Sequence, residues 1–396
     1  MLELARLRAD TPGCLDKSFL DSAGSALPPT PVLDAMIGHL RREAEVGGYL
    51  AAAEREVELG AVRGSIARLI GAAPGEIALT DSASRAWTTA FDAIVTSEGI
   101  GPGDRVLVTN AEYASNAIAM LHHAQRAGFH VELVPNDASG QVDLAALEEL
   151  LDERVRLISL VHMPSNSGLV NPVRAVVDAA HRFGALVLLD ACQTVGQLEI
   201  DVASLGVDAL TATGRKWLRA PRGTGFLYVR ADLLTRLAPS AIDQAGASLS
   251  GASYTLQPDA RRFEFWEYDV AARLGLGAAA DYLLEIGMAE AERAIRANAE
   301  ALRAGLARVP GLRLRDRGIR PAGIVTFTLA RHDPAPVRDR LRAAGVIVTV
   351  SPSSSSPLNM SDGGQVDVVR ASPHYFTSPA DIERCVDAVH TVSRDC

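Results

Sequence analysis

Residues 185–216 read ALVLLDACQTVGQLEIDVASLGVDALTATGRK, and this stretch decides the fold. The run at 185–189 is entirely apolar, which is typical of a strand covered on both faces of a parallel sheet. Asp190 ends that strand, a second strand is predicted over 207–213, and Lys216 follows in the next loop. An acid and a lysine are therefore predicted near the carboxyl edge of one sheet, where ligands of such folds bind.

Outward from this stretch, short apolar runs alternate with amphipathic stretches. Strands are predicted at 76–80, 105–110, 130–135, 155–162, 185–192, 207–213 and 223–230. Helices are predicted at 84–94, 116–128, 143–151 and 173–183. Alternating strands and helices indicate an α/β fold with a mainly parallel, doubly covered sheet, here of seven strands.

The pattern changes after about residue 265. Helices are predicted at 271–288, 289–306, 335–344 and 379–392, with strands at 323–329, 346–350 and 366–370. This order indicates a smaller, C-terminal α+β domain. We therefore predict an N-terminal segment over 1–17 that packs on the smaller domain, a larger domain over 18–265 and the smaller domain over 266–396.

Composition narrows the classes of function. The 396 residues carry 39 Lys and Arg against 48 Asp and Glu, a net charge of −9. An acidic chain is not expected to bind nucleic acid or anionic membranes. No apolar run approaches the roughly 18 residues of a membrane span, and the first residues lack a signal-peptide core. The four cysteines form no disulfide framework or CxxC pair, so we expect a cytoplasmic protein without a structural metal.

Common nucleotide and hydrolase motifs are missing. There is no GxxxxGK[ST] phosphate loop, no GxGxxG that joins a strand to a helix, and no GxSxG. His122 and His123 are adjacent rather than four residues apart, so they do not form a helical zinc pair. These absences direct attention to the acid and the lysine.

Asp190 and Lys216 carry the strongest chemical signal. Taken alone, Asp190 could cap backbone amides, and Lys216 could be a solvated loop residue. Lys216, however, lies in TATGRKWLRAPRGTG among glycines and prolines, with Arg215 beside it. A neighbouring cation and partial burial both lower the pKa of a lysine, which imine chemistry requires. Asp190 could hold the proton of a heterocyclic nitrogen.

A third candidate is TDSASRAW at 80–87, where a predicted strand turns into a helix. Small residues at a helix N-terminus leave backbone N–H groups for an anion, and the helix dipole favours phosphate. The alternative is an ordinary serine N-cap. Thr213, three residues before the lysine, could add a hydroxyl to the same phosphate.

The whole chain resembles a known family. Together with these motifs, FLDSAGSALPPTPVLDA at 19–35 and VRASPHYFTSPADIERCVDAV at 369–389 are similar to the class V aminotransferase branch of fold type I pyridoxal-phosphate enzymes. That branch includes cysteine desulfurases, selenocysteine lyases, isopenicillin N epimerase-like proteins and ergothioneine-pathway sulfoxide lyases. The resemblance implies pyridoxal 5′-phosphate as cofactor, bound by the domain over 18–265, and a homodimer.

The resemblance also assigns roles by position. Lys216 would bind the cofactor covalently, Asp190 would pair with its ring nitrogen, and Gln193 would contact its phenolic oxygen. The remaining cofactor contacts would come from Tyr113, stacked on the ring, from Ser82, Ala83, Ser84 and Thr213 at the phosphate, and from either Asn166 or Ser165.

Arg370 matches the arginine that binds the substrate carboxylate, a role suited to its planar fork; taken alone, it could be a surface charge at a strand end. Asn116 and Trp266 are predicted to contact the substrate.

Three departures from the family pattern bear on the reaction. Desulfurases carry a persulfide-forming cysteine on a loop in the second half of the chain. The corresponding region here, SPSSSSPLNMSDGG at 351–364, contains no cysteine. Arg215 replaces the usual histidine before the lysine, and RFEFWEYDV at 262–270 replaces a segment that often reaches a neighbouring subunit. With EVGGY near the start, the pattern resembles the epimerase-like and sulfoxide-lyase branch most.

These features predict a lyase that cleaves the C–S bond of a cysteine-derived amino acid or its sulfoxide by β-elimination, releasing pyruvate and ammonia. A persulfide-relay desulfurase is disfavoured. An epimerase or racemase remains an alternative, with Tyr113 as a second acid opposite Lys216, and so does an aminotransferase. A non-catalytic carrier of the cofactor is a further alternative from another class. The expected partner is a small amino acid, not nucleic acid or a membrane.

Overall fold

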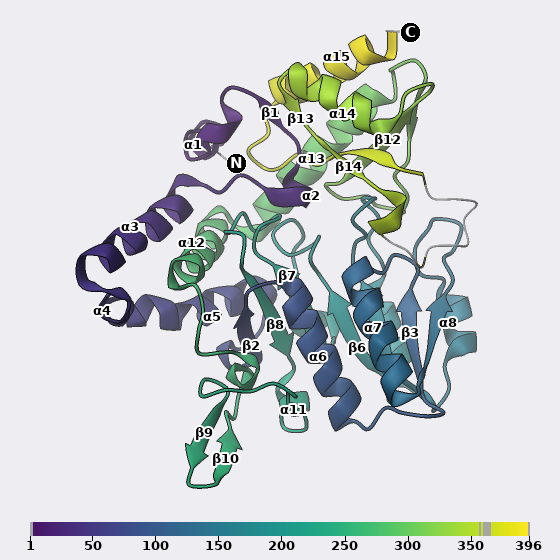
Figure 1. Ribbon diagram of the computed structural model, residues 1–396. Helices are drawn as coiled ribbons and strands as arrows, with labels where there is room; N and C mark the ends of the chain where they lie inside the picture. The colour runs from purple at the N-terminus through teal and green to yellow at the C-terminus, as the bar shows by residue number, and fades with distance from the viewer. Residues whose placement is uncertain (1–2, 356–357, 359–365, 395–396) are drawn as a thin grey trace.

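The computed structural model describes residues 3–355, 358 and 366–394, and a seven-stranded sheet forms its centre (Figure 1). In space the strands lie in the order β2, β8, β7, β6, β5, β3, β4. Within this sheet β8 runs opposite to the other six strands, which are all parallel to one another. The bounds are β2 Ile77–Thr80, β3 Arg105–Thr109, β4 His130–Val134, β5 Val155–Val161, β6 Leu186–Asp190, β7 Ala209–Thr213 and β8 Gly225–Val229. The predicted mainly parallel seven-stranded sheet is confirmed.

Strand β6 shows why its sequence is apolar throughout. Leu186 and Leu188 belong to one hydrophobic core, and Val187 and Leu189 belong to the other, because successive side chains of a strand point to opposite faces. Both faces are therefore covered by helices (Figure 1). The helices that contribute to these cores include α6 Ala83–Ser97 and α7 Ala114–Ala127 on the first face, and α5 Glu56–Ile70, α9 Val173–His181 and α12 Val270–Ile286 on the second.

Helix α12 joins the core of the larger sheet although it follows residue 265. It packs against α5 and against α3, and its Leu276, Ala280 and Leu283 lie in the same core as Val187. The predicted domain boundaries stay a prediction, but the packing of α12 extends the larger core past the proposed boundary. The other helices of this part are α2 Ser22–Ser25, α3 Thr30–Val46, α4 Gly48–Glu54, α8 Leu144–Leu150, α10 Val202–Leu205 and α11 Ala231–Leu234.

A second, four-stranded antiparallel sheet lies in the C-terminal part, in the order β11, β12, β15, β14. The predicted single strand over 346–350 is wrong, because its two halves pair with different partners. Val346–Ile347 pairs with the N-terminal β1, and Thr349–Ser351 pairs with β15. The bounds are β1 Ser18–Phe19, β11 Leu312–Leu314, β12 Val325–Leu329, β13 Val346–Ile347, β14 Thr349–Ser351, β15 Val368–Ala371, α13 Met288–Leu306, α14 Pro334–Ala343 and α15 Pro379–Arg394.

A β-hairpin that the sequence did not predict projects from the larger part (Figure 1). Strands β9 Ala247–Ser250 and β10 Ser253–Leu256 pair antiparallel. Gly251 lies in their two-residue turn with φ 60°, a conformation that glycine adopts without steric cost. Short 3₁₀ turns lie at Pro12–Cys14, Pro74–Glu76, Ala260–Phe263 and Ser353–Ser355.

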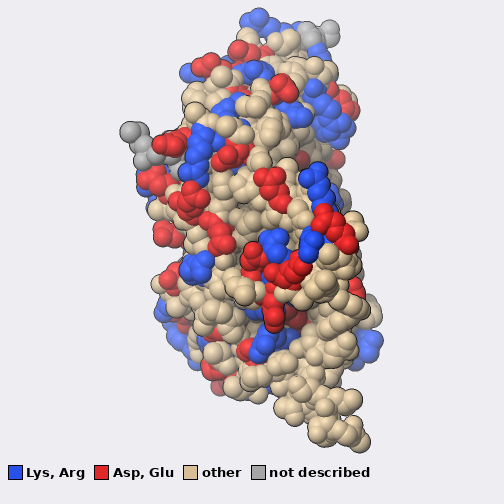
Figure 2. All heavy atoms as spheres, turned by 90° about the vertical axis from the view of Figure 1, so that its left-hand side faces the viewer, with Lys and Arg blue, Asp and Glu red and all other residues tan. Residues whose placement is uncertain are grey.

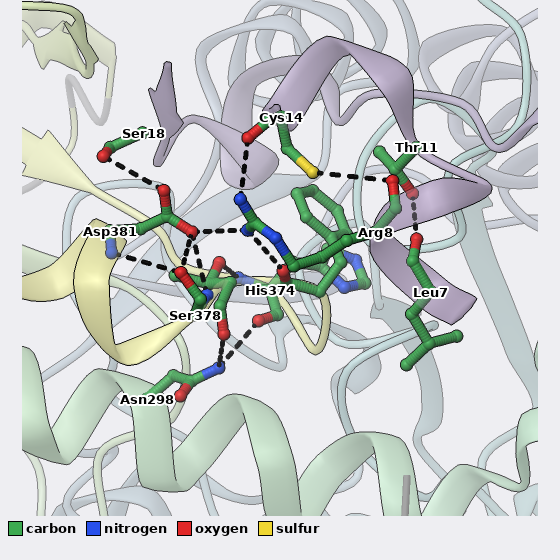
Figure 3. Close-up of polar contacts among 11 residues, drawn as sticks. Leu7, Arg8, Thr11, Cys14, Ser18, Asn298, His374, Ser378 and Asp381 are labelled. Atoms are coloured by element: carbon green, nitrogen blue, oxygen red, sulfur yellow. Dashed lines mark hydrogen bonds and ion pairs between the residues drawn. The ribbon is translucent and has the colours of Figure 1, made fainter. Parts of the chain in front are cut away.

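The N-terminal segment is bound to the C-terminal part by a polar cluster (Figure 3). Arg8, on helix α1 Leu4–Ala9, forms an ion pair of 2.6 Å with the buried Asp381 of α15. The same arginine donates to the carbonyl of Phe376, and the Ser18 hydroxyl donates to Asp381. Asp10 also accepts a hydrogen bond from Tyr282 of α12. The segment therefore contacts both parts of the molecule. Across the described ranges, no helix is long and apolar enough to cross a membrane.

Candidate active site

A pocket lies at the carboxyl edge of the larger sheet, where β5, β6 and β7 end and helices α6 and α7 begin. The carboxyl ends of parallel strands meet at one edge, so residues distant in sequence converge there. Eight of the predicted site residues line this pocket: Ser82, Ala83, Ser84, Tyr113, Asn116, Asp190, Thr213 and Lys216.

Asp190 is the last residue of β6, and both of its carboxylate oxygens accept hydrogen bonds. Oδ1 accepts from the backbone N–H of Cys192 at 2.9 Å, which is the capping role considered as the alternative. Oδ2 accepts from Asn116 Nδ2, also at 2.9 Å. The side chain is 7% exposed, so two fixed donors orient a carboxylate that still lines the pocket. Such a group can hold the proton of a nearby heterocyclic nitrogen.

Lys216 lies in the turn that joins β7 to β8. The turn is tight, because the N–H of Arg219 donates to the carbonyl of Lys216 and a side chain at Gly214 would collide with Thr224 Oγ1 at 2.2 Å. Burial, together with the smaller effect of the charge of Arg215, lowers the pKa of Lys216 to about 8. With this pKa about a fifth of the molecules carry the neutral, nucleophilic amine at about pH 7.4, far more than for an ordinary lysine.

This pKa leads to a prediction for the uptake of an aldehyde cofactor. The rate at which cofactor-free protein forms the covalent bond should rise about tenfold per pH unit below pH 8, because only the neutral amine attacks. Above pH 8 the rate should level off. Stopped-flow absorbance between pH 6 and 10 measures it. A rate that keeps rising to the ordinary lysine range near 10.5 would contradict the assignment, and free N-α-acetyllysine serves as the control for that range.

The N-terminus of α6 forms the opposite side of the pocket. Ser82 is an N-cap, since its Oγ accepts from the N–H of Arg85 at 3.2 Å, so the ordinary capping role is confirmed. The first N–H groups of a helix have no acceptor within the helix, however, and those of Ala83 and Ser84 belong to residues that line the pocket. Gly225 allows the start of α6 to lie close to β8, because a Cβ atom at position 225 would be only 2.8 Å from the backbone nitrogen of Ala83. The arrangement suits a phosphate.

Arg370 comes from β15 of the smaller sheet and lies next to the pocket. Its Nη1 donates to the carbonyl of Ser165 at 2.9 Å, and its Nη2 lies 3.3 Å from Asp21 Oδ1. Arg370 Nε and Ser165 Oγ are buried and have no partner among the described residues. Ser165, rather than Asn166, lines the pocket. Buried polar atoms of this kind need a partner, and a bound anionic substrate can supply one.

Two predicted residues lie away from this pocket. The Gln193 side chain donates to the carbonyl of Ala23 at 3.1 Å and accepts from Trp217 Nε1 at 2.9 Å. Trp266 is 45% exposed, with its ring centre 6.0 Å from that of Tyr49, and it lines a separate cavity. Their roles toward cofactor and substrate stay predictions.

Arg215, expected from the sequence to act on Lys216, also lines the pocket. Two further residues belong to the site and were not assigned a role from the sequence: Cys192 lines the pocket, and Glu112 lies behind Asn116. Burial raises the pKa of the Cys192 thiol well above its ordinary value, and the nearby Asp190 acts in the same direction. The thiol is therefore neutral. The only sign of Glu112 in the sequence is its spacing of four residues from Asn116, which allows the two side chains to form a hydrogen bond.

Comparison with known proteins decides the family. The model of the family described as Aminotransferase class-V matches residues 18–385. The chain belongs to the class V aminotransferase family. A cysteine desulfurase of Dickeya dadantii is 32% identical over 410 residues, covering 98% of this chain and 96% of the relative. A probable cysteine desulfurase of Methanothermobacter thermautotrophicus is 30% identical over 386 residues, with 95% of each chain covered.

Solved structures of the family share the fold. A cysteine desulfurase from Escherichia coli has a TM-score of 0.90 at 24% identity and covers 99% of this chain and 98% of its own. A cystine C–S lyase, determined with cysteine persulfide, has a TM-score of 0.87 at 23% identity, with 96% and 99% covered. The predicted fold type I architecture is confirmed.

The cofactor of this class V enzyme is pyridoxal 5′-phosphate. The residues present fit it, since its phosphate, its ring nitrogen and its aldehyde each have a matching partner in the pocket. The start of α6 and Thr213 suit the phosphate, the Asp190 carboxylate suits the ring nitrogen, and the amine of Lys216 suits the aldehyde.

Proposed function

We propose that the protein is a pyridoxal-phosphate-dependent lyase that cleaves the C–S bond of a cysteine-derived amino acid or its sulfoxide. The observation that carries this proposal is the place of the cysteines: the loop over 351–364 has none, and the cysteine that lines the pocket is badly suited to accept sulfur. Cys192 lines the same pocket as Lys216, yet burial keeps its thiol neutral. A neutral thiol is a poor acceptor of sulfur, because the thiolate is the nucleophile.

The other cysteines offer no better acceptor. Cys14 and Cys385 are buried, and burial raises the pKa of both thiols. Cys396 lies outside the described residues, as does most of the cysteine-free loop over 351–364. Sulfur is therefore proposed to leave directly with its substituent rather than through a persulfide on the enzyme.

The residues of the chain divide the work between binding and proton transfer. Arg370 would bind the substrate carboxylate through its fork. Lys216, neutral in a large fraction of molecules near pH 8, would take the α-proton. Asp190 would keep the ring nitrogen protonated. Bound pyridoxal phosphate supplies the electron sink that makes the α-proton acidic and a β-substituent a leaving group. The balance is one S-substituted cysteine and one water giving a thiol, pyruvate and ammonia.

One experiment tests the proposal against the alternatives. The purified holoenzyme is mixed with an S-substituted L-cysteine, with its sulfoxide, and with L-cysteine, while pyruvate, ammonia, alanine and sulfide are measured. Equal amounts of pyruvate and ammonia from an S-substituted substrate support the lyase. Alanine from L-cysteine, together with a persulfide found on the protein by alkylation and mass spectrometry, would establish a desulfurase and overturn the proposal. Exchange of the α-proton with solvent deuterium without pyruvate would favour the epimerase.

We also propose that the chain forms a homodimer. Large apolar side chains are exposed on α4 and on the β9–β10 hairpin, namely Tyr49, Leu50, Leu249 and Tyr254. Figure 2 shows that the projecting hairpin is free of charged residues on this face. An exposed apolar patch of this kind marks an interaction surface. Sedimentation equilibrium of the 41.9 kDa chain at micromolar concentration distinguishes a dimer from a monomer, and a monomer would contradict the proposal.

A further inference from the structure

A second buried carboxyl group lies behind Asp190. Glu112 immediately precedes Tyr113, the N-cap of α7, and is 0% exposed. The described residues give it no ion pair with any lysine, arginine or histidine. All of its partners are neutral donors: Ser159 Oγ of β5 at 2.6 Å, Asn116 Nδ2 at 2.9 Å and the N–H of Tyr113 at 3.0 Å. A buried acid without a cation is costly, and such groups cluster at functional sites.

A single amide links the two carboxyl groups. Asn116 Nδ2 has two hydrogens, and it donates to Glu112 Oε1 and to Asp190 Oδ2 at the same distance of 2.9 Å. The two acceptor oxygens are therefore at most about 6 Å apart. Asn116 is itself 3% exposed, so both of its bonds lie out of water, where electrostatic interactions are stronger than at the surface.

We propose that Glu112 is a positioning residue for the cofactor: through Asn116 it orients the Asp190 carboxylate, and its own ionisation adds a second negative charge at the ring-nitrogen end of the site. The proposal concerns cofactor binding and does not depend on which reaction the enzyme catalyses. The outcome of the lyase assay therefore leaves it unaffected.

The ionisation of Glu112 falls within the working range of pH. Burial and, less strongly, the charge of Asp190 raise the pKa of Glu112, the hydrogen bonds from Ser159 and Asn116 oppose the rise, and the net pKa is about 7. Asp190 is the charged group that acts on Glu112; the contacts from β5 and α7 are neutral. Below pH 7 Glu112 is neutral, and above it the site contains a second anion. That anion favours a protonated ring nitrogen, so the effect of Glu112 on cofactor binding should appear only above about pH 7.

The variant Glu112→Gln tests this directly, because glutamine keeps the shape and can accept from Asn116 while the Ser159 hydroxyl reverses its direction. The affinity of cofactor-free full-length protein for pyridoxal 5′-phosphate is measured by fluorescence from pH 5.5 to 9, together with the absorption spectrum of the holoenzyme. We expect equal affinity within about twofold at pH 6 and about tenfold weaker binding of the variant at pH 8.5. The spectrum of the variant should lose the change that the wild type shows near pH 7.

Thermal melting of the cofactor-free protein gives a second readout. Glu112 has a pKa of about 7 when folded against about 4.3 when unfolded. Its raised pKa therefore costs the wild type stability progressively as the pH rises from about 4 to 7. Glu112→Gln should lack this loss. The difference in Tm between the variant and the wild type should therefore shift in favour of the variant by roughly 3–5 °C when the pH is raised from 5 to 8.

Ser159→Ala is the matched control. It keeps the charge of Glu112 and removes one hydrogen bond that stabilises the anion, so the pH at which affinity and spectrum change should move upward. Parallel pH profiles of Glu112→Gln and wild type would overturn the proposal. A variant that binds the cofactor poorly at every pH, including pH 6, would assign Glu112 a purely structural role and would overturn it as well. Should Glu112→Gln not fold, an unmoved profile for Ser159→Ala decides against the proposal.

Discussion

Lys216→Ala is expected to lower the turnover of any amino-acid substrate at least about 10³-fold, because the variant loses both the covalent attachment of the cofactor and the base that takes the α-proton. The chain is unusually suited to testing this, since Lys17 and Lys216 are its only lysines. Borohydride reduction of the holoenzyme should therefore place the pyridoxyl label on a single tryptic peptide, the one containing Lys216.

Lys17→Ala is the matched control for this experiment. It precedes β1, far in sequence from the pocket, and it does not line the pocket. The control should keep wild-type turnover and wild-type labelling. A label on Lys17, or wild-type turnover by Lys216→Ala, would show that the pocket beyond β6 and β7 is not the catalytic site.

Asp190→Asn is expected to reduce kcat by roughly 10²–10³-fold while the protein still binds the cofactor. The substitution keeps the size of the side chain and the acceptor for the N–H of Cys192, but it removes the charge that holds a protonated ring nitrogen. The new amide N–H₂ group would also face the N–H₂ group of Asn116, so the Asn116 side chain must rotate to present its oxygen as an acceptor. Steady-state kinetics with the cofactor absorption spectrum measure both effects.

Melting of Asp190→Asn alongside wild type separates a loss of chemistry from a loss of structure. The expected result is a holoenzyme with nearly full cofactor content and very low turnover. Full activity in this variant would exclude Asp190 as the partner of the ring nitrogen. Restoration of activity by a cofactor analogue whose ring carries a permanent positive charge, such as an N-methylated pyridoxal phosphate, would support it.

The central sheet could be predicted from sequence because its signals are local. The run at 185–189 is apolar on both faces, and the two cores on either side of β6 explain that pattern directly. Asp190 and Lys216 could be predicted for a related reason. A residue at the end of a parallel strand has its position fixed by the strand, so the strand pattern alone brings both to one edge.

Features that depend on tertiary packing could not be predicted. Glu112 reads in sequence as an ordinary acid before a helix, and its burial arises only when β5 brings Ser159 against it. Helix α12 was recognised as a helix, but nothing in its composition distinguishes a partner in the larger core from one in the smaller sheet. The strand over 346–350 reads as continuous, because the change of partner at Val348 leaves no mark on apolar periodicity.

The backbone at Ala23 joins the two sheets through its own two polar groups. Its N–H donates to Ser372 Oγ, beside the smaller sheet, and its carbonyl accepts from Gln193, just beyond the larger one. The preceding Asp21 pairs with Arg370 of the smaller sheet. The carbonyl of the following Gly24 accepts from Arg215, in the turn that carries Lys216. A rotation of one sheet against the other would therefore change the backbone conformation around Ala23 or break one of that residue's two hydrogen bonds. Ala23 therefore couples the strand that carries Arg370 to the larger sheet that carries Lys216, in addition to the direct hydrogen bond from Arg370 to Ser165.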